Sequence, residues 1–323
     1  MIPIHPHTHP PIQARWKIIA AGVLLALFAF AGCNSYITRI VSQSLGRIGE
    51  TIPSPPHMIA TPYLPNANLA VAWAGHATMV IQIHDKIIVT DPLLTNTLGM
   101  VVKRYVKTAL DPSLLPKVDA TIVSHIHFDH FSYGSLDMLP KGGILTIPLG
   151  AADYTPDLGF RKVVEMKPWQ MVEEDGLKIT AVPVQHFTGR YGFDAAWLGT
   201  LGYTGYIIQY KEFTVFFAGD TGYNPEMFKE IGRRYSIDLA LIPIAPGSSY
   251  GLGSYVHVNP RGALEIFKDV HAKYMVPMHF GTLFYGPTTN PNESLDLLRS
   301  VAASEHLSDK VIGLEMGEQR VLF

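Results

Sequence analysis

Residues 124–130 read Ser124-His125-Ile126-His127-Phe128-Asp129-His130, with four potential metal ligands in six residues. They follow an apolar run at 120–123, which we expect to form a buried strand. Because side chains alternate along an extended segment, His125 and His127 can bind one ion, whereas Asp129 and His130 can face a second. Imidazole and carboxylate ligands without a thiolate suit Zn²⁺, Mn²⁺ or Fe²⁺. The stretch therefore predicts a metal-dependent hydrolase.

Further candidate ligands follow other short apolar runs. His186 follows the run at 177–184, Asp220 follows 213–218 and His279 follows 274–278. In α/β architectures the ends of strands converge, and sites form in the loops beyond them. We therefore expect these three residues to join the histidine-rich stretch in one site.

This arrangement resembles the metallo-β-lactamase fold, a mixed α/β (α+β) four-layer αβ/βα sandwich with a two-metal site at the edges of its sheets. In the β-lactam-cleaving zinc enzymes of this superfamily a cysteine usually stands where Asp220 stands here, which argues against β-lactamase activity. The resemblance implies a first metal held by His125, His127 and His186, a second held by Asp129, His130 and His279, and Asp220 bridging both.

Several motifs between about Leu69 and Gly286 narrow the resemblance to N-acylphosphatidylethanolamine-hydrolysing phospholipase D and its bacterial relatives. Two positions depart from that family, because Pro168-Trp169-Gln170 replaces a paired Trp and Phe280 replaces a Trp. These departures concern the substrate side and leave the metal ligands intact. The matching motifs are Trp73-Ala74-Gly75-His76-Ala77-Thr78, Thr90-Asp91-Pro92, His186-Phe187-Thr188-Gly189-Arg190, Gly219-Asp220-Thr221-Gly222-Tyr223 and His257-Val258-Asn259-Pro260.

The predicted chemistry is hydrolysis of a phosphodiester. Two divalent cations lower the pKa of a shared water, supply hydroxide near neutral pH and clamp the oxygens of a phosphoryl group, so no side-chain nucleophile is required. The candidate catalytic residues are Asp220, which would also orient the hydroxide, together with Asp129 and His257. Asp91 could hydrogen-bond a ligand imidazole and fix its tautomer.

His257 precedes Asn259-Pro260, an N-cap and first-turn pair that predicts a helix over 261–270. A helix start attracts anions, and the resemblance places this histidine beside the metals. There it could bind a phosphate oxygen or protonate the leaving group, with a purely structural histidine as the alternative. We expect His76, in the Gly-His-Ala-Thr turn, to support the site rather than act directly.

The N-terminus resembles a bacterial lipoprotein signal peptide over residues 1–33. Arg15 and Lys17 precede an uncharged apolar run at 18–31, and the run ends at Cys33, the only cysteine in the chain. A lone cysteine at this place favours lipidation over a disulfide or a metal site. An uncleaved membrane anchor and a buried helix are the alternatives. Asn34 favours the outer membrane of a bacterial cell envelope over the inner one.

Domain organisation and charge complete the prediction. Residues 34–65 contain five prolines and are predicted to be a tether, and residues 66–323 are predicted to form one hydrolase domain. The net charge of −2 and the lack of basic runs make nucleic acid a poor partner. The segments 93–106 and 191–206 could line an acyl-chain groove, with ordinary core as the alternative.

We therefore expect a membrane-tethered hydrolase with two divalent ions, Zn²⁺ before Mn²⁺ or Fe²⁺, that cleaves a phospholipid such as an N-acylphosphatidylethanolamine. The membrane contact would come from lipidated Cys33. A lactonase or sugar-phosphate-type hydrolase with the same ligands is the alternative enzyme. A metal-binding envelope protein without turnover is the alternative of another class, and it would leave the complete ligand set unexplained.

Overall fold

The computed structural model describes residues 42–98, 102–191, 193–245, 251–283 and 290–323. The predicted signal peptide, Cys33 and the beginning of the predicted tether lie outside the described residues. Within these ranges, no helix combines the length and the apolar character that a membrane span requires.

The first of two large sheets has seven strands in the order β15-β1-β2-β3-β6-β7-β8. Strands β15, β1, β2 and β3 pair antiparallel, and β3, β6, β7 and β8 pair parallel. Their bounds are β1 Leu69–Gly75, β2 Thr78–Ile83, β3 Lys86–Thr90, β6 Ala120–Ile122, β7 Ile144–Pro148, β8 Lys162–Met166 and β15 Gln319–Val321.

The second sheet has six strands in the order β14-β13-β12-β11-β10-β9. Strands β9 to β12 are antiparallel, and β12, β13 and β14 are parallel. A small hairpin of β4 and β5 stands apart from both sheets. The bounds are β4 Thr97–Leu98, β5 Val102–Lys103, β9 Met171–Glu174, β10 Leu177–Val182, β11 Gly205–Tyr210, β12 Phe213–Phe217, β13 Leu239–Pro243 and β14 Tyr274–Met278.

The main core lies between the two sheets. Along β1, Leu69, Val71 and Trp73 belong to this core, whereas Ala72 and Ala74 pack in a second apolar cluster behind the sheet. Both faces of the strand are therefore covered, which explains why the strands read as continuous apolar runs rather than alternating ones.

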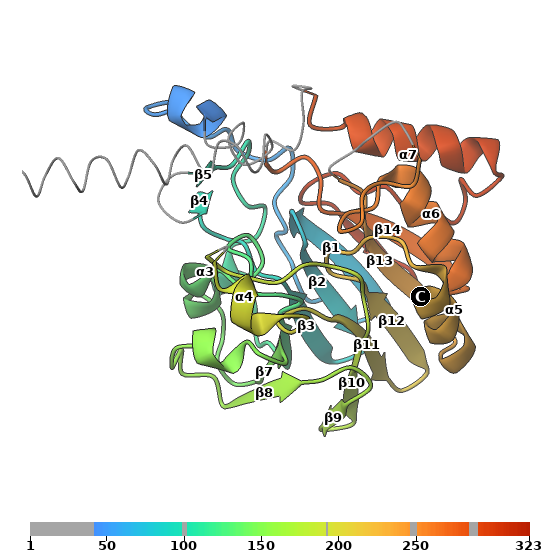
Figure 1. The fold of residues 1–323 in the computed structure, drawn as a ribbon, viewed down its shortest axis with the longest axis horizontal. Helices are drawn as coiled ribbons and strands as arrows, with labels where there is room; N and C mark the ends of the chain where they lie inside the picture. Colours follow the sequence, from blue (N-terminus) through green and yellow to red (C-terminus); the bar gives the residue numbers. More distant parts are fainter. Residues whose placement is uncertain (1–41, 99–101, 192, 246–250, 284–289) are drawn as a thin grey trace, which may run out of the picture.

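Helices cover the outer faces of the sheets (Figure 1). Helices α5 (Pro225–Arg234), α6 (Pro260–Asp269) and α7 (Glu293–Ser304) lie beside the second sheet. Leu136 of α3 (Tyr133–Asp137) and Leu198 of α4 (Ala195–Leu198) pack with β7 in a third apolar cluster. The predicted sandwich is confirmed. The predicted helix start is also correct, because Asn259 accepts a hydrogen bond from Gly262 N at 3.0 Å and Pro260 follows it.

The described part of the predicted tether lies against the domain. Ile59 is buried and its N–H donates to Ala109 O at 2.9 Å, and Ser44 Oγ accepts from Lys103 N at 3.1 Å. These contacts hold Ser44 beside β5 and Ile59 beside Ala109. The division into tether and domain at residue 65 stays a prediction.

Candidate metal centre

The histidine-rich stretch forms the loop between β6 and α3. Its first histidine, His125, makes an isolated antiparallel bridge with Tyr203, and Ile126 N donates to Gly202 O at 3.2 Å. The rings of His125 and His127 lie 4.4 Å apart between their centroids, as the alternation of an extended segment predicts. The loop is thereby fixed at the edge where both sheets end.

Three histidines form the first ligand group. The ligand atoms of His125, His127 and His186 lie within 4.8 Å of one another, and His186 Nε2 is 3.4 Å from His127 Nδ1. His186 Nδ1 donates to Val256 O at 2.9 Å, which leaves Nε2 with a lone pair directed at the group. His125 Nδ1 contacts Ser124 Oγ at 2.9 Å. The structure thus brings together the three histidines that we expected to hold the first metal.

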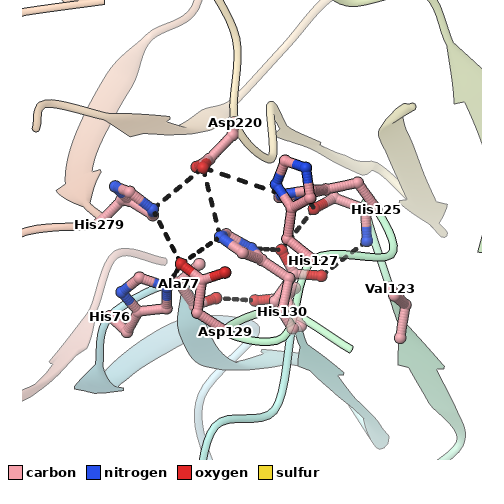
Figure 2. A network of polar contacts seen from close by, with 12 residues as sticks. His76, Ala77, Val123, His125, His127, Asp129, His130, Asp220 and His279 are labelled. Carbon is pink, nitrogen blue, oxygen red and sulfur yellow. Dashed lines mark hydrogen bonds and ion pairs between the residues drawn. The ribbon is translucent and has the colours of Figure 1, made fainter. Parts of the chain in front are cut away.

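The second ligand group contains the three predicted residues and one more. Asp129 Oδ2 lies 3.6 Å from His130 Nε2 and 4.0 Å from His279 Nε2. His76 Nε2 lies 3.2 Å from the same oxygen (Figure 2). His279 Nδ1 donates to Ala245 O at 3.0 Å. His76, which we expected to support the site, has its ring inside this group. Its position directly after β1 is the signal that also marked His279 after β14.

Asp220 lies between the two groups (Figure 2). Its Oδ2 is 3.0 Å from His279 Nε2 and 3.3 Å from His130 Nε2, both in the second group. The same oxygen is 3.9 Å from His125 Nε2 in the first group. One carboxylate at the end of β12 therefore faces both sets of ligands, which is the place that a bridging ligand requires.

Asp91, directly after β3, supports both groups from behind. Its Oδ2 lies 2.6 Å from His130 Nδ1 and also accepts from Ser124 Oγ at 2.6 Å, while Oδ1 accepts from Ser124 N at 2.6 Å. Ser124 in turn contacts His125. The buried carboxylate thus orients one imidazole of each group, directly or through Ser124, and holds their other nitrogens toward Asp220.

Burial keeps most of the site imidazoles neutral. It lowers the pKa of His127 to about 4 and that of His76 to about 3, and it holds the pKa of His186 well below its usual range. His130 is the exception. Burial also opposes its charge, but the carboxylates led by Asp220 outweigh burial and raise its pKa well above the usual value. Neutral imidazoles are the form that binds a metal ion.

The site contains buried polar atoms that the protein itself does not satisfy. Among the residues that the structure describes, they have no hydrogen-bond partner and converge on the space around Asp220. Such atoms cost free energy when they are buried without a partner, and a cation would supply that partner. With only imidazole and carboxylate donors, the site fits divalent ions such as Zn²⁺. The atoms are His125 Nε2, His127 Nε2, His130 Nε2 and Asp220 Oδ1.

The chain matches the beta-lactamase superfamily domain over residues 86–280, a range that contains every predicted metal ligand. The chain belongs to this superfamily. It is 28% identical over 298 residues to an uncharacterized protein of Mycobacterium tuberculosis, covering 87% of this chain and 77% of that protein. It is also 28% identical over 275 residues to N-acyl-phosphatidylethanolamine-hydrolyzing phospholipase D 1 of Caenorhabditis elegans, covering 78% of this chain and 75% of that protein. The predicted resemblance is confirmed.

Metal-dependent hydrolases of the superfamily share both sequence and fold with this chain. One from Methanopyrus kandleri is 28% identical over 215 residues, covering 66% of this chain and 85% of that protein. The solved structure of a metallo hydrolase from Ignicoccus hospitalis superposes with a TM-score of 0.58 at 23% identity, covering 78% of this chain and 97% of that chain. Together with the ligand groups, these findings make the chain a metal-dependent hydrolase of the metallo-β-lactamase fold.

His257 lies on the side of the metal centre that is more exposed to solvent. Its Nδ1 lies 3.6 Å from Asp220 Oδ2, and its side chain keeps 17% of its surface exposed. The ring centroid is 5.2 Å from that of His186. Burial lowers the pKa of His257 to about 4, so the imidazole is neutral near pH 7. A neutral imidazole can donate a hydrogen bond to a phosphate oxygen, but it is a poor source of a proton for a leaving group.

Exposed aromatic side chains surround the mouth of the centre, and we call them the aromatic rim. Ring contacts join several of them to a ligand or to one another, because Phe187 lies 4.4 Å from His127, and Tyr191 lies 5.8 Å from Phe128 and 5.9 Å from Phe193 between ring centroids. Among the described residues between 187 and 201, no exposed side chain is charged. The rim consists of Phe128, Phe187, Tyr191, Phe193, Trp197 and Tyr255.

The rim contains only part of the predicted acyl-chain groove. Tyr191, Phe193 and Trp197 come from the predicted segment 191–206. In the other predicted segment, 93–106, Leu93 and Arg104 are fully buried, which excludes them from an exposed groove. Residues 99–101 of that segment lie outside the described residues.

Proposed function

We propose that the chain is a two-metal phosphodiesterase that hydrolyses a phospholipid of the N-acylphosphatidylethanolamine type at a membrane surface. The observation that carries the proposal is the position of Asp220, whose single Oδ2 atom faces both ligand groups. Two cations held side by side are suited to a phosphodiester, because they neutralise the charge of the phosphoryl oxygens and lower the pKa of water.

The side chains of the protein have distinct roles in this proposal. His125, His127 and His186 would hold one ion, whereas Asp129, His130 and His279 would hold the other. Asp220 would offer its carboxylate to both groups and would accept a hydrogen bond from the attacking water. His257 donates a hydrogen bond to a phosphate oxygen from the open side, and His76 holds Asp129 in place through its 3.2 Å contact.

The aromatic rim supports a lipid over a sugar phosphate as the substrate. The side chains of the rim are aromatic and exposed, and none of them is charged. Contiguous exposed apolar surface is uncommon on soluble proteins and marks contact with an apolar partner. The relative from Caenorhabditis elegans, whose name gives a phospholipid as its substrate, supports the same choice.

A membrane location follows from the sequence of the N-terminus rather than from the described fold. The apolar run at 18–31 ends at the lone Cys33. We propose that Cys33 is lipidated in a bacterial cell envelope, with the outer membrane favoured. An anchored enzyme meets a lipid substrate at a high effective concentration, which is consistent with an active site opening through an apolar rim.

The proposal is tested with the full chain, purified in mild detergent and loaded with Zn²⁺ or Mn²⁺. Its activity is measured on N-acylphosphatidylethanolamine, on bis-p-nitrophenyl phosphate and on an acyl-homoserine lactone. We expect turnover of both phosphodiesters and about two bound ions per chain, with Asp220→Ala removing most activity. Asp296→Ala, an exposed carboxylate change on α7, is the matched control. Turnover of the lactone alone would replace the proposal with a lactonase.

A further inference from the structure

Arg190 is a buried arginine that lies directly behind the metal loop. It follows His186 by four residues and is 6% exposed. None of the roles proposed above uses it. The hydrogen bonds that its guanidinium group donates to described residues run to backbone carbonyls and not to a carboxylate, although a buried cation ordinarily requires a counter-charge. The cost of burying this charge therefore needs another explanation.

The guanidinium binds both ends of the metal loop. Its Nη1 donates to Ile126 O at 2.9 Å and to Phe131 O at 2.9 Å. Ile126 stands between His125 and His127, and Phe131 directly follows His130. A single nitrogen thus fixes the separation of two carbonyls that enclose the ligands of both metal groups.

The flat faces of the same group are also occupied by the loop and by the start of α3. The guanidinium carbon lies 4.3 Å from the ring centroid of Phe128, which stands between His127 and Asp129. It lies 4.3 Å from the ring centroid of Tyr133 at the start of α3. These contacts between a cation and aromatic faces partly compensate the missing carboxylate.

The backbone of Arg190 is held independently. Asp194 Oδ2 accepts from Arg190 N at 2.7 Å, and Oδ1 accepts from Tyr191 N at 2.9 Å. Asp194 is fully buried, and Gly189 before the turn has a φ of +113°, which favours glycine. The side chain of Arg190 therefore extends toward the metal loop from a turn whose backbone is fixed by hydrogen bonds.

We propose that Arg190 is a positioning residue that preorganises the loop 125–131 for metal binding. The inference rests on the proposed metal centre and extends it to a residue that touches no metal. Without the guanidinium, the two carbonyls would lose their common donor and the loop would have to be ordered by the ions themselves. Part of the binding free energy of the ions would then be spent on ordering, and their affinity would fall.

Lysine is the discriminating substitution because it keeps the charge and the length but loses the planar fork. An ammonium cannot stack flat against two rings and reach the same two carbonyls from one rigid plane. Arg190→Lys is therefore expected to weaken binding of Zn²⁺ by about 10- to 100-fold, the usual effect of removing support from behind metal ligands. At saturation the variant should still bind two ions.

Arg104→Lys is the matched control. Arg104 is also fully buried and donates to backbone carbonyls, from Nε to Val106 O at 2.9 Å, but none of these carbonyls belongs to the metal loop. This variant measures the general cost of replacing a buried arginine. It should lower the melting temperature of the metal-free chain and leave the affinity for Zn²⁺ within about threefold of the wild type, because the loop is untouched.

Two measurements on the full chain test the role of Arg190. Zn²⁺ affinity is measured by competition with a chromophoric chelator, and hydrogen exchange of loop 125–131 is measured in the metal-free state. We expect faster loop exchange and weaker binding in Arg190→Lys only. If that variant fails to fold, Tyr133→Leu, which removes one stacked ring but keeps the guanidinium, should show the same changes to a smaller extent.

The possible failures are distinguishable. Unchanged Zn²⁺ affinity and loop exchange in folded Arg190→Lys, with a lower melting temperature equal to that of Arg104→Lys, would reduce Arg190 to an ordinary core residue. Arg190 would equally be an ordinary core residue if only Tyr133→Leu folds and it leaves both quantities unchanged. A wild-type chain that binds no Zn²⁺ would overturn the metal centre and the role of Arg190 together.

Discussion

His257 is the side chain best placed to contact substrate, because its ring is part of the centre and still partly exposed. We expect His257→Ala to keep two bound ions, since seven other side chains form the ligand set. Turnover should fall by roughly 10² to 10³, the range for removing one hydrogen-bond donor from a charged oxygen of the reacting group. Because burial keeps this imidazole neutral, we expect a role in phosphate binding, with equal losses on phospholipid and bis-p-nitrophenyl phosphate.

The losses of turnover on the two substrates also distinguish phosphate binding from proton donation by His257. A much smaller loss on the p-nitrophenyl ester, whose leaving group needs no proton, would identify His257 as a proton donor instead. His271→Ala, an exposed histidine beyond α6, is the control for replacing a histidine as such. Loss of metal from His257→Ala, seen by elemental analysis, would make the residue a ligand.

The buried imidazoles also predict a pH dependence of stability for the metal-free chain. The pKa values of His127 and His257 are about 4 when folded, whereas unfolded histidine titrates near 6.5. Between these values the unfolded chain binds more protons, so the free energy of unfolding falls as pH decreases from 6.5 to 4. His76, His125 and His186 add to this effect, because their pKa values are also lowered.

Urea unfolding in the presence of a chelator at pH 7, 6, 5 and 4 measures this slope. His130, whose pKa is raised, contributes the opposite sign, but its contribution changes only above about pH 6.5. Below that value the five lowered imidazoles dominate. A profile that is flat from pH 7 to 4 would contradict the neutral, buried state of these residues.

Individual site residues could be predicted where the neighbouring residues in sequence form a recognisable pattern. His186, Asp220 and His279 each follow an apolar strand, and the strand ends do converge. The contacts of Asp91 with Ser124 and His130 could only be suspected, because they join β3 to a loop that is 33 residues away in sequence. Pairings of this kind depend on how strands are ordered within a sheet, which periodicity does not encode.

At the scale of elements, the same limit applies to the aromatic rim. An aromatic residue in sequence predicts burial as readily as exposure, so the segment 191–206 could be read as core or as groove. In the structure, the side chains of Phe193 and Trp197 are 68% and 65% exposed. The side chain of Leu198 is buried and packs with residues of β7. The short helix α4 thus divides the segment into a packed face and an exposed one.

The exposed face should contribute to activity on lipid surfaces and not to the chemistry. Each large aromatic side chain transferred from water contributes about 1.5–3 kcal/mol. We expect Phe193→Ser with Trp197→Ser to lower turnover of N-acylphosphatidylethanolamine in phosphatidylcholine vesicles by at least about tenfold. Turnover of soluble bis-p-nitrophenyl phosphate should stay within about twofold, since neither residue is placed among the ligands.

The control for the rim is a pair of exposed apolar residues at the far edge strands. Val163→Ser in β8 with Met171→Ser in β9 removes apolar surface of 47% and 50% exposed side chains away from the mouth. Vesicle sedimentation of each metal-free variant separates lipid binding from catalysis. Equal vesicle activity of the rim variant and the wild type would show that the rim does not contact lipid.

At the scale of the whole molecule, the proposed lipidation of Cys33 would place this chemistry at a membrane. We expect Cys33→Ser to abolish lipid labelling in a bacterial host and to leave the protein as an uncleaved precursor or as soluble material. The chemical reason is that the lipid would be attached through the cysteine sulfur, and a serine hydroxyl is a much weaker nucleophile than a thiolate. Unchanged labelling and processing of the variant would rule out the lipoprotein proposal, and Ser35→Ala is the neighbouring control.

Three residues of the centre, His76, Asp91 and His279, have left-handed backbones, with φ values of +56°, +34° and +62°. Each such conformation costs of the order of 1–3 kcal/mol for a residue other than glycine. Selection for thermal stability alone would therefore favour asparagine or glycine at these positions. In metal-free protein we expect His279→Asn to melt above the wild type, and with Zn²⁺ to melt below it. Thermal stability and catalytic activity should therefore favour different residues at these three positions. In a mutational scan scored separately for folding and for turnover, the native residues should rank low for folding and high for turnover.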